Sequence, residues 1–355
     1  MKYRRLIILS LVVLLMAYMA IPASAEDGVQ LSLEDAIKKS LDSSKELAAL
    51  RKGIETKDVA MDDAMTGVYY TPIDRGYNAS DKATFQNYYS TEYDLKKAKK
   101  ELENEKNQLV IDTKEAYFDV LSYNKQLNVK EKNVEVDKLK LSQVKAKYAV
   151  GMASNSDIKA AETTLATDSA SLEDIKVKLD KAYAQLNTYV GLEQGSRPVL
   201  TSEIEADFKP IDDVDRVAGI AANGSFDVWT AKEAAKLASV TKIFQTWVDV
   251  GEYKEEQANL TAASTKENIE VELRDMCNNI NYLLQKKNEL EVQKEELSEK
   301  YRIAKLKYDL GMITRDEVDS LEASLLLADS GIFDITEKYV IATDTLDKYM
   351  GKLKY

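Results

Sequence analysis

Apolar side chains recur along most of this chain at alternating spacings of three and four residues, the period of helices that pack as coiled coils. Glycine is absent from Asp81 to Val150 and from Glu252 to Leu310, so each stretch predicts one very long helix, the first spanning at least Glu92 to Tyr148. Two interleaved series at seven-residue intervals mark the buried face of that first helix: Leu95, Leu102, Leu109, Ala116 and Tyr123, and Val120, Leu127, Val134, Leu141 and Tyr148.

The chain also repeats itself at a constant offset. The segment Lys145–Ser154 returns as Lys305–Thr314, and the closing Leu186, Tyr189 and Gly191 return in the same register as Leu346, Tyr349 and Gly351. The returning helices carry apolar stripes in the same phase: Ile158, Ala161, Leu165, Leu172, Ile175, Leu179, Ala182, Leu186 and Tyr189 in the first copy, and Val318, Leu321, Leu325, Ile332, Ile335, Tyr339, Ala342, Leu346 and Tyr349 in the second. A repeat of this length is a whole supersecondary unit. We therefore predict a mainly α fold of tandem-duplicated, long antiparallel helical hairpins that pack in a coiled-coil-like way, with little or no β structure.

Four segments follow from these patterns. Residues 1–25 are a predicted signal peptide, because Lys2, Arg4 and Arg5 precede an apolar run from Leu6 to Met19 and the small residues of Ala23-Ser24-Ala25 offer a cleavage site. A retained membrane anchor is the alternative, but Pro22 ends the run short of the roughly 20 residues that a spanning helix needs. We expect a first helical repeat at 26–190, an inter-repeat linker at 191–212 and a second repeat at 213–355.

Composition argues against several functions. The chain has no histidine, which removes the commonest general base and metal ligand, and its single cysteine, Cys277, cannot form an internal disulfide. Beyond residue 25 it carries 46 basic and 61 acidic residues, a net charge of −15 that disfavours nucleic acid as a partner. Without a metal-ligand cluster or a glycine-rich phosphate loop, we expect no enzyme activity, no metal site and no cofactor.

The motifs resemble the outer-membrane efflux proteins of the TolC type. The opening Leu31-Ser32-Leu33-Glu34-Asp35-Ala36-Ile37, with Ser32 as the expected N-cap, is similar to the start of that family. The turns Tyr148 to Asp157 and Tyr308 to Glu317, and the hairpin end Leu186 to Gly191, resemble the family's repeats. The resemblance covers nearly the whole chain after the signal segment.

This resemblance implies an exported channel or duct component of a tripartite efflux or type I secretion system in the cell envelope. It implies that the chain is an α-barrel protomer, which assembles as a homotrimer and passes substrates outward through a helical tunnel, with a periplasmic adaptor protein and an inner-membrane pump as partners. A non-conducting cell-envelope scaffold or spacer with the same fold is the alternative.

The resemblance also implies where these contacts lie. The expected adaptor-docking tips are Val150, Gly151, Met152 and Ser154 in the first hairpin and Leu310, Gly311, Met312 and Thr314 in the second. Just past the turns, the expected acidic ring of the entrance consists of Asp157, Asp316, Glu317 and Asp319. The paired Met152 and Met312 are apolar at positions where an exposed turn favours a polar residue, and this favours docking.

The sequence departs from the family where membrane strands are expected. Thr66–Ser90 is rich in tyrosine but is interrupted by Pro72, Gly76 and Asn78, so it offers at most one short β-hairpin. Phe244–Lys266 predicts helix, a turn near Gly251, and helix again. We therefore expect the strands of the outer-membrane barrel to be lost or reduced, and any outer-membrane contact to be peripheral, through the Thr66–Ser90 tip.

Overall fold

The computed structural model describes residues 30–71 and 76–354, so the predicted signal peptide lies outside the described residues. Within these ranges almost every element is helical. In chain order they are β1 (Gln30–Leu31), α2 (Leu33–Ser43), α3 (Lys45–Tyr69), α4 (Ala79–Ala149), α5 (Asn155–Val190), β2 (Val199–Leu200), α6 (Val214–Gly224), α7 (Phe226–Thr241), the 3-10 turn η1 (Lys242–Phe244), α8 (Val248–Asp309) and α9 (Arg315–Met350). The expected mainly α fold of long hairpins is confirmed, and the long helix predicted from Glu92 to Tyr148 begins earlier than that, at Ala79.

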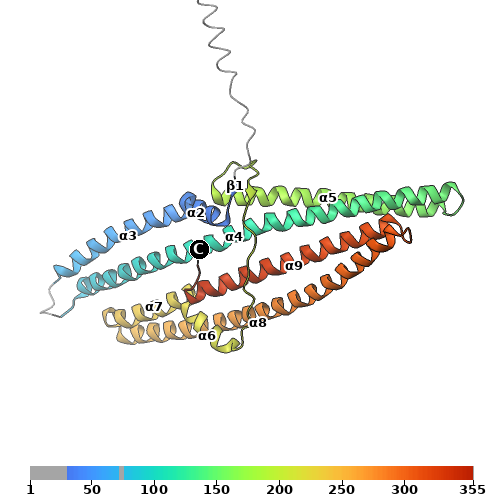
Figure 1. The fold of residues 1–355 in the computed structure, drawn as a ribbon. Helices are drawn as coiled ribbons and strands as arrows, with labels where there is room; N and C mark the ends of the chain where they lie inside the picture. Colours follow the sequence, from blue (N-terminus) through green and yellow to red (C-terminus); the bar gives the residue numbers. More distant parts are fainter. Residues whose placement is uncertain (1–29, 72–75, 355) are drawn as a thin grey trace, which may run out of the picture.

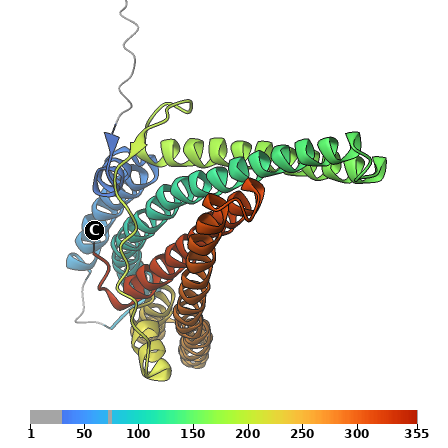
Figure 2. The same ribbon diagram turned by 45° about the vertical axis from the view of Figure 1, so that its right-hand side comes forward.

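The helices form a curved wall one helix thick (Figures 1 and 2). Toward one end the order across the wall is α5, α4, α9 and α8, because α4 packs on α5 and α9, and α9 packs on α8. Toward the other end α3 and α7 take the places of α5 and α9 beside α4 and α8. The wall therefore ends in two open edges, one formed by α3 and α5 and the other by α8.

The predicted stripes line the contacts between these helices. In α5, Ile175, Leu179, Ala182 and Leu186 are buried, and in α9 the corresponding stripe buries Val318, Tyr339 and Leu346. Burial of the apolar face is what stabilises helices of this length, since isolated helical propensity contributes little. Two cores result, one around α2, α4 and α5 and one around α6, α8 and α9.

The two repeats also begin with equivalent pairs of helices. The pair α2 and α3 corresponds to the pair α6 and α7, because side-chain N-caps stand at matching positions, Ser32 and Asp213 before the first helix and Ser44 and Ser225 before the second. Ser32 accepts a hydrogen bond from the Asp35 amide at 3.1 Å, as the opening motif predicts. The second copy is shorter, because α7 has 16 residues against 25 in α3, and α8 has 62 against 71 in α4.

The segment 201–212, which we call the strap, crosses the wall between the two repeats (Figure 1). Its first end is held by the Tyr117 hydroxyl, which accepts from the Ser202 amide at 2.9 Å and donates to the Leu31 carbonyl of β1 at 3.0 Å. Its second end is held by Tyr339, whose hydroxyl accepts from the Lys209 amide, and by Asn281, whose amide side chain bonds both backbone groups of Ile211. The strap thereby joins the two cores.

The turn predicted near Gly251 is wrong. Gly251 is a buried residue within α8, and the change of direction lies at 245–247, before α8 begins. A Cβ at Gly251 would lie 2.5 Å from the Lys242 carbonyl oxygen, so this glycine permits η1 to approach the helix closely. The pattern could not separate these roles, because a glycine in a turn and a glycine at a close backbone contact look alike in sequence.

The segment Thr66–Ser90 is helical on both sides of a loop, and no strand occurs among its described residues. Aromatic contacts join this loop and the first turns of α4 to η1: the rings of Phe85 and Phe244 stack at 5.2 Å, and Tyr77 lies edge-on to both. Tyr69, Tyr70 and Trp247 are exposed. None of the helices in the described ranges combines the length and apolar character that crossing a lipid bilayer requires.

One position in the α4–α5 seam is charged in both helices. Asp137 sits between Val134 and Leu141 at seam spacing, is 7 % exposed, and its Oδ2 lacks a hydrogen-bond partner among the described residues. Burial, and then the facing Asp168 of α5, raise the pKa of Asp137, while Lys140 acts in the opposite direction. At the equivalent positions of the second copy the chain has Leu297 and Ala328.

Asp168→Ala, which copies Ala328, is expected to stabilise the protein at pH 7.5, because it removes the charge that faces the buried Asp137 and helps to raise its pKa. Folding raises the pKa of Asp137, so ionising this carboxyl lowers the stability of the folded protein. This cost is absent below the pKa of the unfolded state and is reached as pH rises through the pKa of the folded state. The gain should therefore shrink at pH 4. Urea unfolding followed by circular dichroism measures the free energy of unfolding of variant and wild type at each pH. Glu131→Ala, at an exposed position of α4, is the control. An equal effect at the two pH values would contradict this account.

Candidate functional site

Both hairpin tips lie at the same end of the wall, and the α4–α5 tip projects beyond the α8–α9 tip (Figures 1 and 2). Their loops, Val150–Ser154 and Leu310–Thr314, join α4 to α5 and α8 to α9. The eight predicted tip residues therefore form two copies of one turn at the same end of the wall.

The two turns have the same backbone geometry. Gly151 and Gly311 adopt φ of 77° and 71°, in the left-handed region that a Cβ disfavours. In each copy the amide of the residue after the glycine donates to the carbonyl five residues earlier. Met152 donates to the Lys147 carbonyl and Met312 to the Lys307 carbonyl, both at 2.8 Å. This is a Schellman ending, which satisfies the last carbonyls of the outgoing helix. Each helix thus stops abruptly.

Two of the predicted acidic residues cap the returning helices. The Asp157 carboxylate accepts from the Ser154 amide at 2.7 Å and from its hydroxyl at 2.8 Å, and these bonds lower the pKa of Asp157. Glu317 accepts from the Thr314 amide and hydroxyl in the same way, at 3.4 and 3.0 Å. Both carboxylates are exposed, so they fix the turn and also contribute negative charge to the tip surface.

The other two predicted acids tie α9 to α4. Asp316 accepts from the Gln143 side chain at 2.6 Å, and although burial raises the pKa of Asp316, the hydrogen bonds from Thr314 and Gln143 lower it overall. Asp319 is only 6 % exposed and lies 3.4 Å from the Lys132 ammonium. Lys132 also contacts Glu322 at 2.8 Å. Asp319 is therefore a buried residue of the polar contact that holds the two hairpins together.

The tips also expose large apolar side chains. Val150, Met152, Leu310 and Met312 are between 68 and 79 % exposed. Large apolar groups clustered at the end of a hairpin are unusual on a free surface and typical of a contact surface. Methionine adapts to imperfectly matched partners because its side chain is flexible.

A second acidic group lies in the middle of the wall. Glu337 of α9 sits beside Glu115 and Asp119 of α4 and Asp334 of α9. Burial, followed by these three charges, raises the pKa of Glu337 to about 8. Ser122 donates to Asp334 at 2.6 Å, which joins α4 to α9 here as well. Sequence reasoning missed this group, because acids spread along helices usually mark a solvated face.

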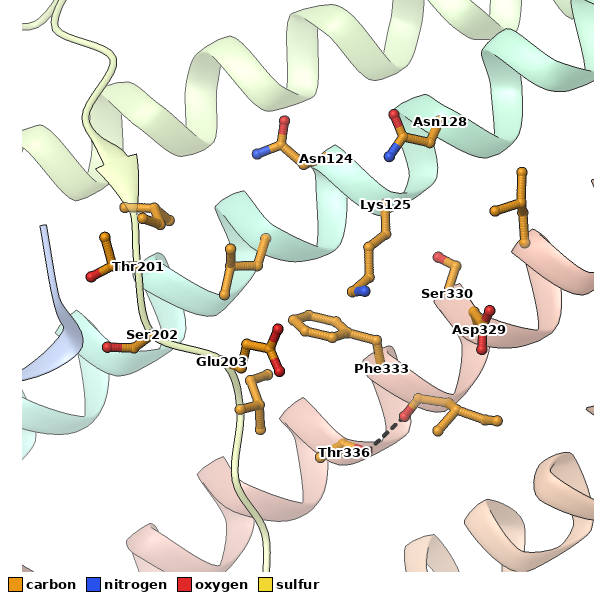
Figure 3. Close-up of a pocket in the computed structure, with 15 residues that line it drawn as sticks. Asn124, Lys125, Asn128, Thr201, Ser202, Glu203, Asp329, Ser330, Phe333 and Thr336 are labelled. Atoms are coloured by element: carbon orange, nitrogen blue, oxygen red, sulfur yellow. Dashed lines mark hydrogen bonds between the residues drawn. The ribbon is translucent and has the colours of Figure 1, made fainter. Parts of the chain in front are cut away.

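A recess of about 690 Å³ lies between α4, α9 and the start of the strap (Figure 3). Its walls combine polar and apolar groups: Asn124, Asn128, Glu203 and Ser330 lie around Phe333, and the Lys125 ammonium lies 5.1 Å from the centre of the Phe333 ring. Among the described residues no group of three or more side chains is arranged to hold a metal ion.

Comparisons with known proteins identify this architecture. Residues 82–192, which cover most of α4 and all of α5, match the sequence profile of the outer membrane efflux protein family. No curated protein sequence matches the chain.

Solved structures match over nearly the whole chain. The CmeC outer membrane channel of Campylobacter jejuni aligns with a TM-score of 0.63 at 12 % identity, covering 91 % of this chain and 86 % of that one. The outer membrane protein VceC of Vibrio cholerae aligns at 0.65 and 13 % identity, covering 90 % and 96 %. The outer-membrane channel OprN aligns at 0.67 and 12 % identity, covering 90 % of each chain. At these identities the likeness is one of fold, and that fold is the one the sequence motifs predict.

Glu337→Gln is expected to stabilise the protein increasingly as pH rises. Because folding raises the pKa of Glu337 from 4.5 to about 8, the folded protein resists ionising this group, and the cost grows across that interval. The difference in Tm between variant and wild type should be small at pH 4.5 and largest above pH 8. Thermal unfolding at five pH values tests this, and Glu295→Gln, an exposed residue of α8, should show no such trend.

Proposed function

We propose that this chain, whose residues 82–192 match the outer membrane efflux protein family, is one protomer of a TolC-like helical duct that carries substrates outward through the cell envelope. The observation that supports this best is the single-layer wall itself. Two hairpins with equivalent tips stand side by side at one end, and both long edges of the wall lack a partner (Figure 1). A layer of this kind buries its remaining apolar surface by closing on copies of itself.

The two open edges complement each other in side-chain size. Large exposed side chains recur along one face of α8: Tyr253, Leu260, Val271, Tyr282, Val292 and Ile303. Along α5 the exposed side chains between positions 160 and 170 are mostly small: Ala160, Thr163, Thr164, Ala166, Thr167 and Ala170. Large groups of one edge can insert between small groups of the other, which favours a head-to-tail ring. A homotrimer with α8 of one protomer against α5 of the next satisfies both edges.

In this assembly the six tips form a ring at one end of the duct. The exposed Met152 and Met312, with Val150 and Leu310, supply an apolar docking surface for the hairpin tips of a periplasmic adaptor, which connects the duct to an inner-membrane pump. Asp157 and Glu317 place exposed carboxylates just behind this surface, where they favour cations at the entrance. Asp316 and Asp319 support the ring by holding α9 against α4.

The opposite end of the duct carries the exposed aromatic residues Tyr69, Tyr70 and Trp247. Tyrosine and tryptophan favour the interface between lipid and water, because each has an apolar ring with one polar group. We place the peripheral contact with the outer membrane at this end, on the loops before α4 and before α8.

The assembly is tested by mass and by shape. The purified protein should have about three times the mass of a protomer by light scattering, and electron microscopy should show a hollow ring in end-on views. Tyr282→Lys in the exposed stripe of α8 should dissociate the ring, whereas Lys300→Ala on the same helix should leave it intact. A stable monomer of wild type at micromolar concentration, or a filled bundle, would be inconsistent with the duct.

The tips are tested by the double substitution of Met152 and Met312 by Asp, with both glycines left in place. Loss of adaptor binding of at least tenfold is expected, because charged groups replace the apolar contact, while helicity and trimer mass stay unchanged. Co-purification with the adaptor measures binding, and the matched control is the double substitution of Met152 and Met312 by Leu. Full adaptor binding by the Asp variant would show that docking lies elsewhere.

A further inference from the structure

The strap is extended but largely unpaired. Side chains along it alternate between outside and inside: Thr201, Glu203, Glu205 and Asp207 are exposed, whereas Ser202, Ile204, Ala206 and Phe208 are half-buried on the wall. This period of two is that of a β-strand. Yet the backbone groups of residues 203–206 make no hydrogen bond to any residue in the described ranges. The strap therefore has the form of a strand without the partner that normally satisfies it.

The strap continues a strand that is paired on one side only. β2 pairs with β1 in parallel, Gln30 opposite Val199 and Leu31 opposite Leu200, and the Thr201 amide extends this ladder to the Leu31 carbonyl at 3.2 Å. On the other side of β2 and the strap lies the recess between α4 and α9 (Figure 3). The free edge thus adjoins a recess whose walls are α4 and α9.

The recess has the size and chemistry to receive an added strand. Its volume of about 690 Å³ falls within the usual range of ligand-binding clefts. Leu121 of α4 and Leu326 and Phe333 of α9 provide apolar contacts on its floor, where alternate side chains of a second strand would point. The six residues 201–206 offer about 20 Å of extended backbone.

The exposed face of the strap is acidic. Glu203, Glu205 and Asp207 project from the same side at alternate positions, and only Asp207 has an ion-pair partner, Lys209, among the described residues. Side chains directly opposite each other on neighbouring strands interact, and opposite charges there are favourable. A strand beside the strap is therefore favoured to carry lysine or arginine outward and apolar residues inward.

We propose that residues 201–206 and the adjoining recess are a docking site for an extended segment of another protein, in which basic and apolar residues alternate, bound by strand addition. The main-chain bonds supply affinity, and the recess and the row of acids supply selectivity. This site lies midway along the wall, so it is separate from the hairpin tips and does not depend on the duct function.

The probe is a nine-residue peptide of alternating lysine and valine, titrated into the purified full-length protein and followed by calorimetry at low and moderate salt. Binding is expected, and N-methylation of the valine amides should weaken it at least tenfold, because it removes backbone donors and leaves charge unchanged. A glutamate–valine peptide should not bind. Equal binding of the methylated peptide would mean that charge alone attracts it, and would overturn strand addition.

The site is located by the double variant Glu203→Lys and Glu205→Lys, which should weaken binding of the lysine–valine peptide at least tenfold. Glu267→Lys with Glu272→Lys changes two exposed acids of α8 by the same charge and should bind as wild type does. Equal losses in the two variants, or none in either, would overturn the assignment. Light scattering of both variants completes the test: a changed oligomeric mass in the strap variant alone would show that a second copy of this chain occupies the strap, which also overturns the proposal.

Discussion

The packing of α4 against α9 is the contact on which the rest of this structure depends. Each hairpin forms its own seam, and among the described residues the α4–α9 contact is the main one that joins the two hairpins near their tips and sets one in register with the other. Much of it is polar: Lys132 meets Asp319 and Glu322, Ser122 donates to Asp334 at 2.6 Å, and Lys114 lies 2.8 Å from Asp344. Half-buried polar pairs contribute little net stability but penalise other registers, because any shift leaves a charge without its partner.

The sequence predicted the helices well and their neighbours poorly. The 3–4 spacing and the glycine-free stretches located the long helices, and Gly151 and Gly311 marked both tips, because each feature reflects local backbone physics. The choice of α9 as the neighbour of α4 did not follow, since the two returning helices carry matching stripes. The strap was predicted only as a linker, although its alternation is visible in the sequence; it depends on Tyr117 and Tyr339, which lie far away along the chain.

The two copies differ at single equivalent positions, and aligning them shows which residues have changed. In the first hairpin Tyr117 on the outgoing helix matches Cys277 of the second, and Leu179 on the returning helix matches Tyr339. Each hairpin therefore keeps one tyrosine in its core, on opposite helices, and each hydroxyl holds one end of the strap. As a result, one tyrosine lies on α4 and the other on α9, the two central helices of the wall. Duplication supplied the stripes, and divergence at single positions gave the strap its two attachment points.

The position of the Asp137–Asp168 pair fits this division of roles. Asp168 fills the seam position between Leu165 and Leu172, so its charge weakens the contact between α4 and α5. On its other side α4 is held to α9 at Lys132 and at Gln143, one on each side of Asp137. The α4 helix is thus held to α9 on both sides of the position where an acid pair faces across its contact with α5.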